Sequence, residues 1–169
     1  MKPTVAPFPA TRLRRLRAMP AIRRLSRQHR LSVDDLIWPI FVMEGQDNEQ
    51  AIASMPGVTR KTVDRAVKAA KEAHKLGIPA LCIFPYTGMS ERTEDCALAW
   101  SPDNISNRAI RAIKDAVPEI AIMTDIALDP YNINGHDGFV ENGRIVNDRT
   151  VDALVKMALA QAKAGADIL

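Results

Sequence analysis

Three aspartates are the residues of this sequence whose type and spacing could do chemistry: Asp125, Asp129 and Asp137 lie within 13 positions of the chain. Carboxylates that meet at one point bind a hard cation such as Mg²⁺, raise one another's pKa for acid–base work, or orient a cationic group. Asp125 is the most telling, because it continues an apolar stretch where an unpaired carboxylate costs free energy. Asp129 precedes a proline and Asp137 precedes a glycine, so these two could equally serve to cap turns.

The other reactive side chains indicate less. His136 lies beside Asp137, but without a second histidine nearby a structural role is favoured over that of a ligand or proton carrier. A Schiff-base lysine needs a desolvated site that lowers its pKa. All eight lysines instead fall in the N-terminal segment, at a helix start or on expected helices: Lys2, Lys61, Lys68, Lys71, Lys75, Lys114, Lys156 and Lys163.

Several classes of protein are excluded or disfavoured. The two cysteines, Cys82 and Cys96, have no CxxC partner, which excludes a zinc ribbon, and we expect both to be packing residues. There is no GxGxxG or GxxxxGK[ST] motif to support a nucleotide-binding fold. No apolar run approaches the roughly 20 residues of a membrane span, and residues 1–10 lack a signal-type core. A cytoplasmic protein with no membrane partner is expected.

Strands and helices must alternate to position these residues. Apolar, β-rich runs predict strands at residues 36–43, 80–84 and 120–126. Helical spacing predicts a helix after each strand, at residues 62–76, 106–117 and 148–164. We expect Thr62 to cap the first helix and Asp148 to cap the last. In the last helix, six apolar residues are expected to face the sheet: Val151, Leu154, Val155, Ala158, Leu159 and Ala162.

The segments between these elements are polar. Residues 44–61 are expected to form a loop. Residues 129–147, after the third strand, are rich in Asp, Asn and Gly, and within them residues 138–146 predict a hairpin with an Asn-Gly turn. Residues 166–169 begin another strand.

One helix per strand predicts parallel βα units, of which three are complete and a fourth ends in its first strand. A (β/α)8 barrel needs roughly 250 residues. We therefore predict an α/β fold that is the first half of a TIM barrel, cut in strand four, with a hairpin insertion after strand three; a doubly wound open sheet is the alternative. Function in a barrel collects at the carboxyl ends of the strands, which selects residues 43–45, 85–86 and 124–138.

A basic arm precedes the barrel. Residues 1–33 carry nine of the 23 Lys and Arg residues and no acid, whereas residues 34–169 carry 14 basic and 20 acidic side chains. Such an arm can dock on the acidic body of a neighbouring subunit, remain a solvated flank, or bind nucleic acid. No aromatic residues for base stacking are interleaved with the arginines, so we favour subunit packing and expect no nucleic-acid partner. The predicted division is an arm at 1–33 and a half barrel at 34–169.

The motifs of the chain resemble those of porphobilinogen synthase, also called delta-aminolevulinic acid dehydratase. The most specific pair is TDIALDPY at residues 124–131 followed by GHDG at 135–138. Further motifs match in the family's order and spacing: RLRRLR (12–17), SMPGV (54–58), LGIPA (76–80), RAIR (108–111), VND (146–148) and AGADIL (164–169). The resemblance covers the chain from about residue 11 to its end.

The resemblance implies a TIM barrel whose arm wraps a partner subunit, in homo-oligomers that are hexamers or octamers. It implies a hydro-lyase that condenses two 5-aminolevulinate molecules to porphobilinogen, with loss of two waters, in heme and tetrapyrrole biosynthesis. The family's two Schiff-base lysines lie on later strands, which agrees with the positions of the lysines here. This chain alone is therefore expected to be inactive.

The resemblance also bears on the metal. Many members hold a catalytic zinc with three cysteines, and the matching positions here are Ala127, Asp129 and Asp137. A thiolate zinc site is excluded, and the chain resembles the aspartate-bearing class, which either is stimulated by Mg²⁺ or needs no metal. Asp125 matches an active-site aspartate of both classes, implied to position or help protonate groups beside the absent lysines. Asp129 and Asp137 are implied to face the amino end of the second substrate, and they are the candidate metal ligands.

Two positions depart from the family pattern. Asn134 stands where a histidine is frequent, and Asn104 stands where a glycine is frequent. Because asparagine tolerates left-handed backbone, we expect the change at Asn104 to be mild.

Two other functions remain open. The first is a non-catalytic half barrel that acts as an assembly or interaction module through the basic arm. The open edge at strand four disfavours it, because an unpaired apolar sheet edge aggregates or pairs. The second is a different barrel lyase or aldolase that shares only the scaffold.

Overall fold

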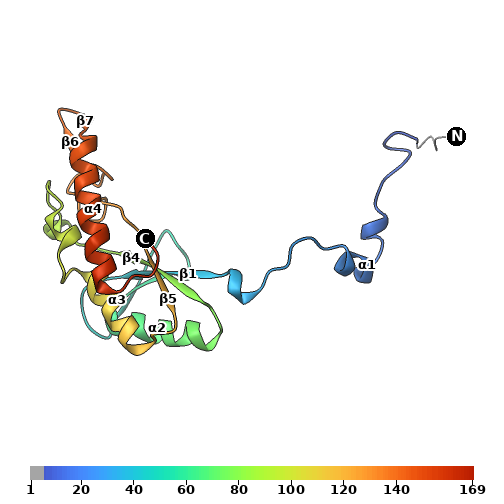
Figure 1. The fold of residues 1–169 in the computed structure, drawn as a ribbon, viewed down its shortest axis with the longest axis horizontal. Coiled ribbons are helices and arrows are strands. Elements are labelled where there is room, and N and C mark those ends of the chain that lie inside the picture. The colour runs from blue at the N-terminus through green and yellow to red at the C-terminus, as the bar shows by residue number, and fades with distance from the viewer. Residues whose placement is uncertain (1–5) are drawn as a thin grey trace. The chain divides into compact units, whose positions relative to one another are not determined.

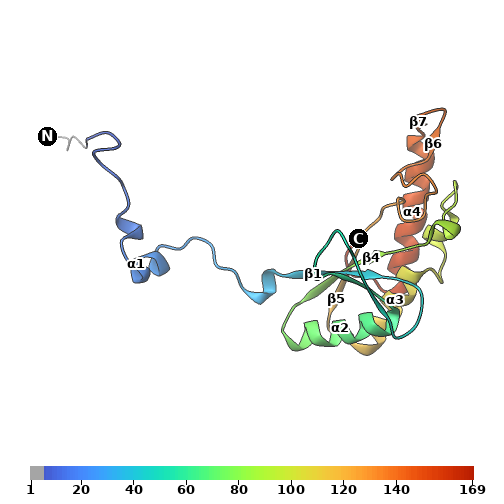
Figure 2. The same cartoon turned by 180° about the vertical axis from the view of Figure 1, so that it is seen from behind.

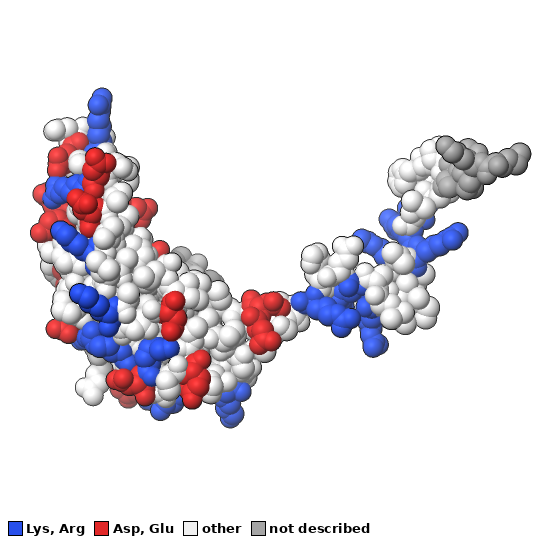
Figure 3. Space-filling view, in the orientation of Figure 1, with Lys and Arg blue, Asp and Glu red and all other residues white. Residues whose placement is uncertain are grey.

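A computed structural model describes residues 6–169, which divide into two compact units at Ser32 and Val33. The first unit holds a short 3-10 helix, η1 (Arg15–Arg17), and a short α-helix, α1 (Pro20–Leu25), and neither has a buried residue. Its described residues include eight arginines and no acid, and Lys and Arg side chains are visible on this unit in Figure 3. The part of the predicted arm that falls on residues 1–5, with Lys2, lies outside the described residues.

A five-stranded sheet is the frame of the second unit (Figure 1). Its strands lie in the order β2-β3-β1-β4-β5. The three predicted strands are present as β1 (Ile37–Val42), β4 (Ala80–Pro85) and β5 (Ala121–Thr124). Both pairings among them are parallel, as the alternation of strands and helices requires.

The three predicted helices are present as α2 (Val63–Lys75), α3 (Ile105–Ala116) and α4 (Asn147–Ala164). In both ribbon views α2 and α3 lie side by side along the sheet (Figures 1 and 2). Their small and β-branched residues pack on the strands in one core, which includes Ala66, Ala70, Ile110, Ile113, Leu81 and Ile83. α4 packs on the neighbouring loops in a second core, around Tyr131, Phe139 and Met157. Three 3-10 turns complete the unit: η2 (Val33–Asp35), η3 (Met89–Glu91) and η4 (Ala97–Trp100).

The loop predicted for residues 44–61 is wrong, because two short strands form there: β2 (Glu49–Ala51) and β3 (Thr59–Lys61). They pair with each other in antiparallel fashion, and β3 pairs with β1 in parallel. Lys61 Nζ donates to Glu49 Oε2 at 2.6 Å across this pair. Neither strand alternates apolar with polar residues, so both depend on pairing at the β1 edge rather than on a local pattern.

The buried face of α4 also differs from the prediction. Val151, Val155 and Leu159 are 48%, 52% and 56% exposed, and the residues buried instead are Thr150, Ala153, Met157, Gln161 and Ala164. The helix is apolar on more than one side, and helical periodicity does not choose between two apolar faces. Its start differs too, because Val146 and not Asp148 is the N-cap. Asp148 lies in the first turn, where a carboxylate interacts favourably with the helix dipole.

Asn104 is not left-handed, contrary to the expectation for this position. Its backbone is extended, with φ −63° and ψ 161°, and it is the N-cap of α3. The side-chain Oδ1 accepts a hydrogen bond from Asn107 N at 2.8 Å. Its Nδ2 donates to Leu98 O and to Ala99 O, at 3.0 Å in each case. The residue therefore serves through its side chain and not through a tolerant backbone.

The predicted hairpin is present as β6 (Val140–Glu141) and β7 (Arg144–Ile145). Its turn residues Asn142 and Gly143 have positive φ, 52° and 73°, as a type I′ turn requires. Near the end of the chain, Ile168 forms an isolated parallel bridge with Met123 of β5. Among the described residues, no helix is long and apolar enough to cross a membrane.

Candidate active site

The sheet presents two faces, because successive side chains of a strand point in opposite directions. One face packs on α2 and α3 through Ile40, Val42, Leu81, Ile83 and Ile122. The alternate residues form what we call the second face: Pro39, Phe41, Cys82, Phe84 and Met123. Phe41 is paired with Phe84 in the register of β1 and β4, and their ring centroids are 5.5 Å apart. The second face therefore ends in an aromatic pair near the carboxyl ends of the strands.

Asp125 is the first residue after β5 and continues the second face. Thr124 is buried on the helix side, with 4% of its surface exposed, so alternation turns Asp125 the other way. The ladder between β4 and β5 ends at the pair of Ile83 and Thr124, and Asp125 is the residue that follows it. Burial raises the pKa of the Cys82 thiol on this face, and the Asp125 carboxylate raises it further. Asp125 thus lies at the carboxyl edge, where barrel enzymes gather their chemistry.

Asp129 and Asp137 come together in the loop that follows. Burial raises the pKa of Asp129, Asp137 raises it further through its charge and a hydrogen bond, and Asp125 adds to the effect. Asp129 therefore lies within electrostatic reach of the other two carboxyl groups, although all three residues are exposed. Because like charges disfavour ionisation, a proton or a cation is held here more readily than beside an isolated aspartate.

This loop is fixed by the segment that joins β4 to α3. Thr93 N donates to Tyr131 O at 3.0 Å, and Arg92 Nη1 donates to Asp129 O at 3.3 Å. Tyr131 is fully buried in the second core. The sequence analysis missed Arg92 and Thr93, because they contact the loop from a distant part of the chain and belong to no recognisable motif.

His136 closes a turn within the loop. Its Nδ1 accepts a hydrogen bond from Gly138 N at 3.1 Å, which agrees with the structural role favoured for it. Asn134 N donates to the Oδ1 of the buried Asn132 at 2.9 Å. Neighbouring polar groups thus shape the turn that carries Asp137.

The side chains that could donate to a metal ion limit which kind of ion this site suits. Within residues 6–169, no three His, Cys, Asp or Glu side chains lie close enough together to hold a metal ion. Asp129 and Asp137 are a pair of oxygen donors, which suits a hard cation that keeps most of its waters and does not suit thiolate-bound zinc. Cys96 packs in the second core, where burial raises its pKa to about 11, and Cys82 is a second free thiol.

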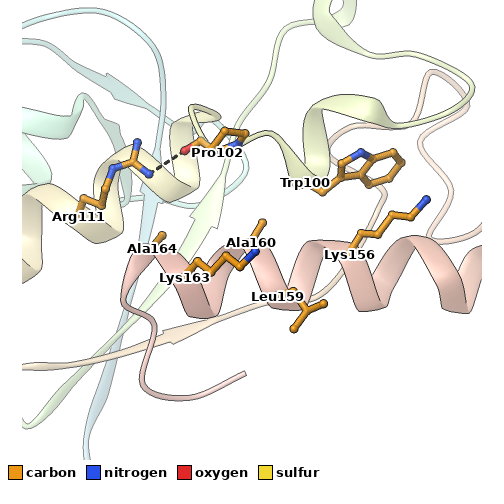
Figure 4. A pocket seen from close by; sticks show the side chains of 8 residues that line it. All are labelled: Trp100, Pro102, Arg111, Lys156, Leu159, Ala160, Lys163 and Ala164. Carbon is orange, nitrogen blue, oxygen red and sulfur yellow. Dashed lines mark hydrogen bonds between the residues drawn. The ribbon is translucent and has the colours of Figure 1, made fainter.

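A hollow of about 490 Å³ lies elsewhere, between α3 and α4 (Figure 4). Trp100 lies beside it, with Lys156 Nζ 5.5 Å from the centre of its ring. Arg111 Nη1 donates to Pro102 O at 2.7 Å along the same wall. None of the three aspartates lines this hollow, so the candidate site and the hollow are separate features.

Comparisons with known proteins point to one family. The family profile described as Delta-aminolevulinic acid dehydratase matches residues 10–169. The delta-aminolevulinic acid dehydratase of Rhodobacter capsulatus is 57% identical over 163 residues, 96% of this chain and 49% of that protein. That of Bacillus subtilis is 39% identical over 159 residues, 94% of this chain and 48% of that protein. The chain spans about half the length of these curated relatives.

A solved structure agrees with this assignment. The chain is similar to the crystal structure of delta-aminolevulinic acid dehydratase (porphobilinogen synthase) from Toxoplasma gondii ME49 in complex with the reaction product porphobilinogen. The TM-score is 0.88 and the identity 38%, over 93% of this chain and 45% of that chain. The α/β fold described above therefore matches part of that family's TIM barrel. In sequence and in fold, the chain belongs to the delta-aminolevulinic acid dehydratase family.

Proposed function

We propose that the full-length protein is a porphobilinogen synthase, which condenses two 5-aminolevulinate molecules to porphobilinogen with loss of two waters. The observation that carries the proposal is the match of residues 10–169 to the delta-aminolevulinic acid dehydratase family; the raised pKa of Asp129, caused by burial, by Asp137 and by Asp125, supports it. This chain contributes the aspartates and the first part of the barrel, while the Schiff-base lysines come from later strands. The chain alone is inactive.

The three aspartates take different parts in this chemistry. Asp125 directly follows the last ladder pair of β4 and β5, and it positions or helps protonate groups beside the lysines. A fixed carboxylate stabilises positive charge best where neighbouring apolar groups partly exclude water. Asp129 and Asp137 face the amino end of the second substrate. Their mutual repulsion favours a substrate ammonium between them, because the cation lowers the electrostatic energy of both carboxylates.

The proposed enzyme belongs to the aspartate-bearing class, which is stimulated by Mg²⁺ or needs no metal. Ala127, Asp129 and Asp137 offer no thiolate at the positions where other members carry cysteines. Asp129 and Asp137 are the candidate ligands for Mg²⁺ in this chain, since this ion is commonly bound through one or two carboxylates and several waters; a Mg²⁺ ion there would take the place of the substrate ammonium.

The basic arm is proposed to assemble the enzyme into homo-oligomers, either hexamers or octamers. Leu13, Leu25 and Leu31 are 89%, 82% and 81% exposed in the arm unit, and a subunit contact would cover such apolar side chains. Attraction between the arm's arginines and the acidic excess of residues 34–169 supports the same contact. The cytoplasmic location expected from the sequence stays a prediction.

Asp125→Ala in the full-length enzyme tests the catalytic proposal. We expect porphobilinogen formation to fall by about 10²- to 10⁴-fold, the range for loss of a group that transfers or orients a proton. Assembly, followed by light scattering, is expected to stay intact because the side chain is exposed. Asp152→Ala, on an exposed position of α4, is the matched control and keeps full activity. Near-normal product formation by Asp125→Ala would remove Asp125 from the site.

A non-catalytic assembly module is the second candidate, favoured by the exposed basic arm. The intact mass of the protein isolated from its native source separates the two proposals. A mass near twice 18.6 kDa supports the synthase, since its second half would then carry the lysines. A mass near 18.6 kDa supports the module.

A further inference from the structure

Gln161 is a fully buried amide that reaches the end of β5 from α4. Its Oε1 accepts a hydrogen bond from Thr124 Oγ1 at 2.7 Å, and its Nε2 donates to Asp125 O at 3.2 Å. Burial of an amide costs free energy unless its polar atoms are bonded. Here the oxygen and the nitrogen are both bonded, and their partners are the two consecutive residues at which β5 ends.

The two hydrogen bonds of Gln161 lie at the point where the ladder between β4 and β5 ends. The pairing of β4 with β5 ends at Ile83 and Thr124. On the other side of β5, Thr124 N donates to Ile168 O at 3.0 Å. The backbone carbonyl of Asp125, the first residue after β5, accepts its hydrogen bond from Gln161 Nε2 and not from a neighbouring strand. Gln161 is therefore the last anchor of the backbone before the chain leaves the sheet.

This anchor determines where the Asp125 side chain points. The Thr124 hydroxyl is held on the helix side by Gln161, so alternation along the strand directs Asp125 to the second face. The bonded carbonyl also fixes the peptide plane that follows Asp125, since the peptide bond itself is rigid. Because the side chain of Asp125 is exposed, its direction depends on this backbone.

We propose that Gln161 and Thr124 form a positioning pair that holds Asp125 in its productive direction. The proposal rests on the proposed function, because it assigns both residues to the same site. Neither residue touches the substrate, and both act through the backbone of Asp125. A misplacement of about 1 Å at a reacting group can cost about 10²-fold in rate.

Steady-state kinetics of the full-length enzyme test the pair. Thr124→Val removes the hydroxyl group and keeps the shape of the side chain. Gln161→Met removes both hydrogen bonds of the Gln161 side chain and keeps its length. We expect each variant to lower kcat by about 10- to 100-fold, with KM changed by less than about threefold and the pH profile of kcat/KM displaced. Thr124→Ser keeps the hydroxyl and restores kcat to within about threefold of wild type. The double variant is expected to be no slower than the slower single one, because both changes break one anchor.

Thr62→Val is the matched control for loss of a buried hydroxyl. Thr62 has no exposed surface, and its hydroxyl bonds Asn48 and Asp64 rather than a candidate aspartate. We expect this variant to lower Tm and leave kcat unchanged. Equal losses of kcat in Thr62→Val and Thr124→Val at matched Tm, or no rescue by Thr124→Ser, would overturn the positioning pair.

Asp125→Ala separates this inference from the proposed function. An active Asp125→Ala enzyme contradicts the proposed function, and the positioning pair with it. An inactive Asp125→Ala enzyme, beside fully active Thr124→Val and Gln161→Met variants, contradicts the positioning pair alone.

Discussion

Asp129 is held beside Asp137, and burial together with this neighbouring carboxyl raises the pKa of Asp129 above its ordinary value. Two like charges at close range repel unless a proton or a cation relieves them. The hydrogen bond from Arg92 Nη1 to Asp129 O helps to keep the loop in place despite that repulsion. Groups whose pKa values are displaced by burial and by like charge are typical of functional sites.

Asp129→Asn is predicted to stabilise the full-length protein at neutral pH. The raised native pKa means that the folded state holds the proton more tightly than the unfolded chain, whose aspartates have a pKa of about 3.9. This contribution to stability is fully present below the unfolded pKa and is lost as the pH rises through the native pKa. Asparagine removes the resulting penalty, so we expect a higher Tm at pH 7 and a much smaller gain near pH 4.

The control for this change is Asp152→Asn, which alters an exposed aspartate of α4 and should leave Tm unchanged at both pH values. Because Asp129 is exposed, salt screens its repulsion, and the gain should shrink at high ionic strength. A gain of equal size at both pH values would contradict the raised pKa.

A chelator that binds zinc and other transition-metal ions, but binds Mg²⁺ only weakly, is predicted to have little effect on porphobilinogen formation. Positions 127, 129 and 137 carry one alanine and two aspartates in place of thiolates, and soft ligands are what a structural or catalytic zinc of this kind needs. Activity would be measured after treatment with 1,10-phenanthroline and again after addition of Zn²⁺ or Mg²⁺. Strong inhibition that only Zn²⁺ reverses would refute the aspartate-class interpretation.

Asn104→Ala is predicted to lower the free energy of unfolding by about 1–3 kcal/mol, because it removes the N-cap hydrogen bond and the two hydrogen bonds that Asn104 Nδ2 donates. Asn104→Asp should fall between this variant and wild type, since it keeps an acceptor for Asn107 N and loses the two donated bonds. Denaturant unfolding of the full-length protein measures both changes. An Asn104→Gly variant as stable as wild type would show that the side-chain bonds contribute nothing.

Gly165→Ala is predicted to lower the free energy of unfolding by about 1–2 kcal/mol through backbone strain. Gly165 follows α4 with φ 110°, and a methyl group there would come no closer than 3.5 Å to a neighbour, so the cost is conformational. Gly88→Ala is the matched control, because its φ is −66° and its space is equally open, and it should be neutral or slightly stabilising. Equal losses in the two variants would contradict strain as the cause.

The sequence by itself determined the order and type of the principal elements. β1, β4 and β5 appear as apolar runs, the pattern typical of parallel strands in α/β folds, and glycines such as Gly165 mark the helix ends. It also determined the family, through TDIALDPY and GHDG, and it brought attention to the three aspartates. These features are local, and residue type and spacing are enough to indicate them.

Only the tertiary structure decided what depends on contacts between distant segments. β2 and β3 exist because an edge of β1 is available for pairing, and α4 buries Gln161 rather than Val155 because the end of β5 lies against that side. The approach of Asp137 to Asp129 and the capping bonds of Asn104 are likewise made across loops. A sequence pattern reports periodicity and propensity along the chain, whereas these outcomes depend on which surfaces meet in space.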